Sequence, residues 1–119
     1  MESFVLYVYV ALFGIVGVIL RFVTNNLFKE AFKINIAYAT FLINIIGSFC
    51  IGVVSKTEIN QDVQIGIMVG LLGGFTTFSG YALDTIRLLE ESTLLGYLNL
   101  ILAPPLMVLS CFLGRKLSV

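Results

Sequence analysis

Four long apolar stretches, joined by short polar turns, constrain the fold of this chain more than any other feature. The stretches cover residues 4–27, 36–54, 63–89 and 94–113, and the turns cover residues 28–35, 55–62 and 90–93. A helix needs about 20 consecutive apolar residues to cross a hydrocarbon core that is ~30 Å thick. The sequence therefore predicts an all-α membrane protein in which one domain, residues 1–119, crosses the plasma membrane with four transmembrane helices.

The composition argues against several classes of function. Of 119 residues, 59% are hydrophobic and 12% are charged, which leaves no material for a solvent-facing catalytic domain. Seven Lys and Arg residues balance seven Asp and Glu residues, so there is no basic surface for nucleic acid. The chain has no His and two separated cysteines, Cys50 and Cys111, and it shows neither a nucleophile–base pair nor a cofactor loop. We expect a protein that is not an enzyme.

Residues 70–81, Gly-Leu-Leu-Gly-Gly-Phe-Thr-Thr-Phe-Ser-Gly-Tyr, interrupt the third apolar stretch. Glycine in a helix interior costs ~1 kcal/mol relative to Ala, and the two threonines can satisfy backbone groups that a broken helix leaves open. Irregular backbone at membrane depth is tolerated only where protein buries it or where it lines a cavity. We therefore expect a broken third helix whose exposed carbonyls and amides are available to an ion.

The basic residues are divided almost evenly between the two ends of the predicted bundle. Three lie at the end that holds both termini and three at the opposite end, with Arg21 deeper in the first helix: Lys56, Arg115 and Lys116 against Lys29, Lys33 and Arg87. Orientation follows the Lys and Arg bias of short loops. Without a bias, we expect the chain to insert in both orientations and to form an antiparallel dimer. The alternative is one orientation set by another signal.

Small residues recur on the first three predicted helices, and they indicate close packing of helices. They are Gly14, Gly17, Gly47, Ser48, Gly52, Gly66, Gly70, Gly73 and Gly74. Four helices of this size enclose little space for a polar pathway, which also favours a dimer.

Polar side chains within the apolar stretches are the candidate functional residues, because they are expensive inside a membrane. Thr40, Asn44 and Ser48 share one helix face and form either contacts between helices or a ladder of hydrogen bonds along a pore. Arg21 either anchors its helix at the interface or draws anions into a vestibule. Phe78 and Tyr81 also share a face; such a pair is usually core, but aromatic edges carry partial positive charge and can solvate an anion.

Three segments together resemble the Fluc/CrcB fluoride channel family. They are Gly14-x-x-Gly17-x-x-x-Arg21-Phe22, Thr40-x-x-x-Asn44-x-x-Gly47-Ser48-Phe49-x-x-Gly52 and Gly70-x-x-Gly73-Gly74-Phe75-Thr76-Thr77-Phe78-Ser79. Their order and spacing match over essentially the whole chain. The resemblance implies an antiparallel, dual-topology dimer with two pores that exports fluoride passively and thereby reduces fluoride toxicity.

The resemblance also implies roles for individual residues. Those on the fluoride pathway are Asn44, Phe78, Tyr81, Thr40 and Ser79, with Arg21 in the vestibule. A structural Na⁺ is implied at the dimer centre, bound by the main-chain carbonyls of Gly73 and Thr76 from each subunit. Carbonyl oxygens are suitable ligands for such a hard cation.

Two features depart from the family pattern. The third-helix motif of the family ends in Ser-Thr-Phe, whereas this chain has Ser79-Gly80-Tyr81. The family also places serines four and eight residues after a tyrosine in the fourth helix, where this chain has Ile101 and Pro105 after Tyr97. The adjacent prolines Pro104 and Pro105 are expected to kink that helix. The chain is therefore either a homodimeric channel or a non-conducting or half-active partner of a homologous subunit.

A proton-coupled small multidrug transporter is a remote alternative, since such proteins are also short four-helix dimers. Their chemistry requires a carboxylate buried in the membrane. The acidic residues here fall at the ends of the stretches or in turns, and Asp84 alone is ambiguous. We expect Asp84 near the interface, paired with Arg87 one turn further along the helix.

Overall fold

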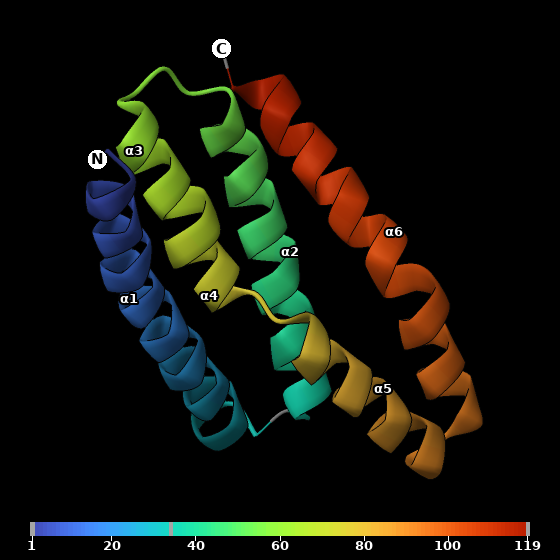
Figure 1. Ribbon diagram of the computed structural model, residues 1–119. Helices are drawn as coiled ribbons and strands as arrows, with labels where there is room; N and C mark the ends of the chain where they lie inside the picture. The colour runs from blue at the N-terminus through green and yellow to red at the C-terminus, as the bar shows by residue number, and fades with distance from the viewer. Residues whose placement is uncertain (1, 34, 119) are drawn as a thin grey trace.

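The computed structural model describes residues 2–33 and 35–118, which are helical almost throughout (Figure 1). The elements are α1 (Glu2–Ala31), α2 (Ile36–Ser55), α3 (Gln61–Ile65), η1 (Gly66–Leu72), α4 (Gly73–Phe75), α5 (Phe78–Glu91) and α6 (Thr93–Leu117). They form four spans that are long and apolar enough to cross a membrane: Ser3–Ala31, Ile36–Ser55, Gln61–Glu91 and Thr93–Leu117. The predicted all-α fold with four transmembrane helices is confirmed.

Polar side chains begin the helices after each connection. Asn35 accepts a hydrogen bond from the Ala37 N–H at the start of α2, Asn60 accepts from the first turn of α3, and Ser92 accepts from the Leu95 N–H in α6. Such N-caps satisfy backbone donors that lack a partner within the helix. In Figure 1 the start of α1, the end of α6 and the connection from α2 to α3 lie at the same end of the bundle.

Glycines let the helix backbones touch at two contacts. Between α2 and α6, a Cβ atom on Gly52 would collide with the Cys111 carbonyl oxygen, and one on Gly114 would collide with the Phe49 carbonyl oxygen. Between α1 and the first half of the third span, a Cβ on Gly17 would collide with the Leu71 carbonyl oxygen. The expectation that small residues mark close packing is therefore confirmed at these contacts.

The third span is broken, as predicted, but the glycines are not where it breaks. Gly73 has helical dihedral angles (φ −64°, ψ −36°), whereas Thr76 (φ −86°, ψ 160°) and Thr77 (φ −150°, ψ 119°) are extended. Gly74 instead provides close packing, because a Cβ there would lie 3.0 Å from the Gly14 carbonyl oxygen. The predicted break within residues 70–81 is confirmed: the threonines form it, and helix packing explains Gly74.

The two halves of the third span pack against different helices. The first half, η1 and α4, lies along α1, and the second half, α5, lies along α6 (Figure 1). Helix α2 packs mainly on α6 and also contacts both halves. Helix α6 remains one continuous helix through Pro104 and Pro105. The break is therefore the point at which one span passes from the α1 side of the bundle to the α6 side.

Candidate functional site at the helix break

A pocket of about 150 Å³ lies beside the break in the third span. Side chains from α2, the break, α5 and α6 line it: Asn44, Ser48, Thr76, Thr77, Phe78 and Met107. Two of the residues predicted for the ion pathway, Asn44 and Phe78, therefore meet at one place. The pocket combines amide and hydroxyl groups with an aromatic ring and a thioether, so it offers polar groups without a formal charge.

Asn44 holds the broken backbone through both atoms of its amide. Its Oδ1 accepts a hydrogen bond from the Thr77 N–H (2.9 Å), and its Nδ2 donates to the Thr77 carbonyl oxygen (3.1 Å). The Asn44 side chain is 3% exposed. Because Thr77 is extended, its two backbone groups need partners from outside the helix, and Asn44 supplies both. Of the two interpretations of Asn44, the structure contains the contact between helices; its contact with an ion stays a prediction.

The hydrogen bonds at the break withdraw donors from two backbone carbonyls. In a continuous helix, the Thr77 N–H would donate a hydrogen bond to the Gly73 carbonyl, and the Gly80 N–H would donate one to the Thr76 carbonyl. Here the Thr77 N–H donates to Asn44 Oδ1, and the Gly80 N–H donates to the Thr77 hydroxyl (2.9 Å). The two carbonyls predicted to bind a cation thus lose their helical donors.

Arg21 reaches the break from α1. Its Nε donates a hydrogen bond to the Gly74 carbonyl oxygen (3.0 Å), near the carboxyl end of the first half of the third span. A cation at this end of a helix is favoured by the helix dipole, and the bond satisfies a carbonyl that the break would leave open. The guanidinium therefore stabilises the break, a role that differs from the two considered from the sequence.

The remaining predicted pathway residues are not in the pocket. Thr40 is 4% exposed and lies one turn from Asn44, and Ser79 is exposed with its hydroxyl 3.3 Å from that of Thr77. Phe78 is 74% exposed, whereas Tyr81 is 5% exposed, although their ring centroids are only 5.6 Å apart. The hydroxyl of Tyr81 faces α6.

The predicted pathway lacked four of the lining residues: Ser48, Thr76, Thr77 and Met107. For Thr76, the prediction concerned only its carbonyl, as a cation ligand. The spacing of Thr40, Asn44 and Ser48 already placed Ser48 on the correct face of α2. Met107 carries no comparable signal, because it is one apolar residue among many in α6. Only the packing of α6 against α2 brings it beside the break.

Asp84 is buried on one face of α5. It is 5% exposed and shares this face with Tyr81 and Leu88, while Arg87 is exposed. The spacing of three and four residues explains this, because it places Asp84 on the buried stripe and Arg87 beside it. The position of Asp84 near the membrane interface stays a prediction.

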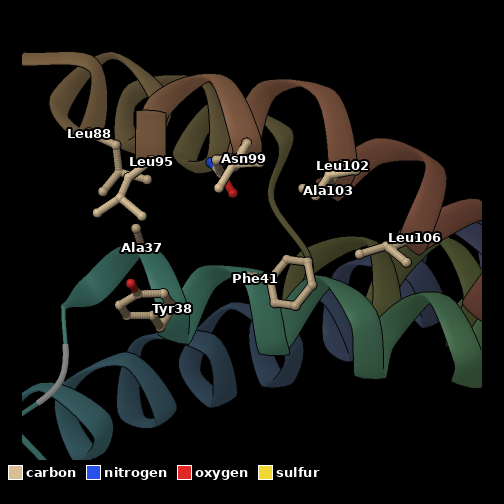
Figure 2. Close-up of a pocket in the computed structure, with 10 residues that line it drawn as sticks. Ala37, Tyr38, Phe41, Leu88, Leu95, Asn99, Leu102, Ala103 and Leu106 are labelled. Carbon is tan, nitrogen blue, oxygen red and sulfur yellow. The ribbon is translucent and has the colours of Figure 1, made fainter. Parts of the chain in front are cut away.

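A second, larger pocket lies between α2 and α6 (Figure 2). It measures about 250 Å³, and most of its lining is apolar, including Phe41, Leu102 and Leu106. Apolar walls cannot replace the hydration shell of an ion. The smaller pocket at the break is therefore the better candidate for an ion site.

Comparisons with known proteins identify relatives along most of the chain. The model of the family described as "CrcB-like protein, Camphor Resistance (CrcB)" matches residues 8–115. A protein of Geotalea uraniireducens is 38% identical over 92 residues, which cover 73% of this chain and 74% of the relative. One of Allorhizobium ampelinum is 42% identical over 93 residues (74% of each chain), and one of Pseudomonas fluorescens is 42% identical over 100 residues (77% of this chain and 81% of the relative).

All three relatives carry the name "Fluoride-specific ion channel FluC". No solved structure matches the chain significantly. The matched range begins inside α1 and ends inside α6. It includes the broken third span and Asn44, whose two hydrogen bonds to the Thr77 backbone we call the Asn44 clamp. On this similarity along nearly its whole length, the chain belongs to the CrcB family.

Proposed function

We propose that this protein is a fluoride-selective ion channel through which cytoplasmic fluoride leaves the cell passively. The observation that carries the proposal is the pocket at the helix break, in a chain whose relatives are named fluoride-specific channels. Fluoride enters cells as neutral HF and is trapped as an anion, and a negative membrane potential drives anions outward. A selective leak therefore reduces fluoride toxicity without an energy source. Family membership does not favour the transporter alternative.

The chemistry of the pocket supports passage of a small anion. The hydroxyl groups of Ser48 and Thr77 and the edge of the Phe78 ring can replace parts of a hydration shell, whereas the Thr76 hydroxyl donates to the Leu72 carbonyl oxygen (2.9 Å). Within residues 2–33 and 35–118, no charged side chain lines this pocket. Conduction requires binding that is weak enough for the ion to leave again, and a fixed cation in the pocket would oppose that.

We propose further that the channel is an antiparallel homodimer. Within one chain, Phe78 and Gly73 are exposed beside the break, as are most apolar side chains of α1, so the pocket is open where a second copy can close it. The even division of basic residues supports two orientations. Tyr81 is buried against α6 and hydrogen-bonded there, so its departure from the family pattern has a structural reason within this chain.

The carbonyls of Gly73 and Thr76 support a structural Na⁺ at the proposed dimer centre. Both lose their helical donors, and Gly73 is exposed, so these oxygens suit a hard cation that an identical subunit also contacts. Bound there, the ion would supply positive charge that holds two broken helices together. We expect replacement of Na⁺ by N-methyl-D-glucamine to dissociate the dimer in detergent, measured by single-molecule photobleaching. A dimer equally stable in both cations would contradict this part of the proposal.

The proposed function is tested by ion release from liposomes that contain this chain alone. We expect rapid fluoride release and no chloride release. Phe78→Ile should slow fluoride release by about tenfold or more, because the ring edge is lost from the pathway. Phe4→Ile is the matched control, since Phe4 is 71% exposed but lies in the first turn of α1.

The outcomes of this assay separate the remaining possibilities. A folded dimer that releases no fluoride would contradict the homodimeric channel. Recovery of release on adding a homologous subunit would then assign this chain the role of a partner subunit. Equal release of chloride would refute selectivity for fluoride.

A further inference from the structure

Tyr81, one of the departures from the family pattern, contacts α6 about one turn before the adjacent prolines Pro104 and Pro105. The Tyr81 hydroxyl is 3.0 Å from the Asn99 carbonyl oxygen and 3.1 Å from the Leu100 carbonyl oxygen. Tyr81 is on α5, and both acceptors are on α6, just before the two prolines. At 5% exposure, the Tyr81 side chain makes these contacts in the protein interior.

Pro104 explains why a donor is needed at this point of α6. A proline has no backbone N–H, so the carbonyl four residues earlier loses its helical hydrogen bond. For Pro104 that carbonyl belongs to Leu100. Water does not reach the hydrocarbon core, and prolines are tolerated in transmembrane helices where neighbouring groups satisfy the freed carbonyl. The Tyr81 hydroxyl lies within hydrogen-bond distance of that oxygen.

A second set of hydrogen bonds closes the connection between the two helices. The Asn99 side-chain amide donates to the Thr85 hydroxyl (2.8 Å), and that hydroxyl donates to the Tyr81 carbonyl oxygen (2.7 Å). Figure 2 shows Asn99 on α6, facing the space between α6 and α2. Thr85 is 4% exposed. Hydrogen bonds between α5 and α6 therefore run both ways: Tyr81 on α5 donates to backbone carbonyls of α6, and Asn99 on α6 donates to Thr85 on α5.

We propose that Tyr81 and Pro104 form one structural unit, in which the phenol replaces the hydrogen bond that the proline removes and so fixes α5 on α6. Tyr81 is then a positioning residue: its ring, 5.6 Å from that of Phe78, holds Phe78 at the pocket. This last step rests on the proposed function. A phenylalanine at position 81 would keep the ring but leave the Leu100 carbonyl without its donor.

The test is a double-substitution cycle with Tyr81→Phe and Pro104→Ala in the full chain reconstituted in lipid. Tyr81→Phe should raise the unfolding equilibrium constant about tenfold, equivalent to ~1.4 kcal/mol, and should slow fluoride release. Adding Pro104→Ala restores a backbone N–H for the Leu100 carbonyl, so it should recover most of both losses. When Tyr81 is kept, Pro104→Ala should change the unfolding equilibrium constant far less, because the phenol already donates a hydrogen bond to the Leu100 carbonyl oxygen.

The coupling between the two substitutions decides the proposal. If Pro104→Ala has the same effect with and without Tyr81→Phe, the unit does not exist. Tyr97→Phe is the control, since Tyr97 is half exposed on α6, and it should show no coupling to Pro104→Ala. The unfolding assay does not depend on whether the protein conducts fluoride. A chain that shows coupling but conducts no fluoride would therefore refute the proposed function and not this unit.

Discussion

The hydrogen bonds of Asn44 predict a large effect from a change of one side chain. Asn44→Leu keeps the branching and the number of heavy atoms of the side chain but removes the donor and the acceptor that pair with Thr77 at 3.1 and 2.9 Å. An unpaired buried backbone group costs ~1–3 kcal/mol, and hydrogen bonds between membrane helices contribute ~0.6 kcal/mol on average and up to ~1.7. For two bonds these ranges overlap at about 2–3 kcal/mol, which is the expected loss in free energy of unfolding.

The measurement is unfolding of the reconstituted chain in mixed micelles with increasing denaturing detergent, followed by circular dichroism. Ser48→Ala is the matched control, because Ser48 lines the same pocket one turn further along α2. It should change the unfolding free energy by less than about 0.5 kcal/mol. An Asn44→Leu protein as stable as the control would show that the clamp does not hold the break, and the reasoning about Thr77 would fail.

Two further predictions concern the surroundings of the break. Gly47→Ala should lower both the free energy of unfolding and fluoride release, because its Cβ would collide with the Thr76 methyl group. Gly73→Ala should not lower the free energy of unfolding of the monomeric chain, because the nearest atom of the same chain lies 3.6 Å from the added Cβ. Arg21→Met should lower the free energy of unfolding by ~1–3 kcal/mol, because the Gly74 carbonyl oxygen loses its hydrogen-bond donor. Arg21→Lys keeps a donor and should lose little stability. Equal losses in the two variants would indicate that the hydrogen bond is unimportant.

Much of the fold was predictable because the membrane limits the choices. Long apolar stretches must become helices in lipid, so the four spans follow from hydropathy, and the predicted ends differ from the observed ones by at most four residues. The break could be placed within residues 70–81, but the two residues that form it could not be identified from the sequence. Glycines that permit a break and glycines that permit close packing have the same sequence signal, and only contacts such as Gly74 with Gly14 distinguish them.

The candidate site was predictable only in part, because its geometry depends on contacts between distant segments. Asn44 and Phe78 could be identified from polarity and spacing, and they meet in one pocket. Tyr81 is only three residues from Phe78, yet its hydroxyl pairs with α6, because Pro104 has opened a carbonyl there. A sequence pattern along α5 alone contains no information about that carbonyl.

The division of the third span between α1 and α6 has a mechanical consequence. Its first half packs on α1 and its second half packs on α6, so a change in tilt between these helices would be taken up by the two extended residues at the break. A mismatch between helix length and hydrocarbon thickness is one cause of such a change in tilt. Because the pocket lies at this joint, we expect lipid chain length to change its shape without any ligand.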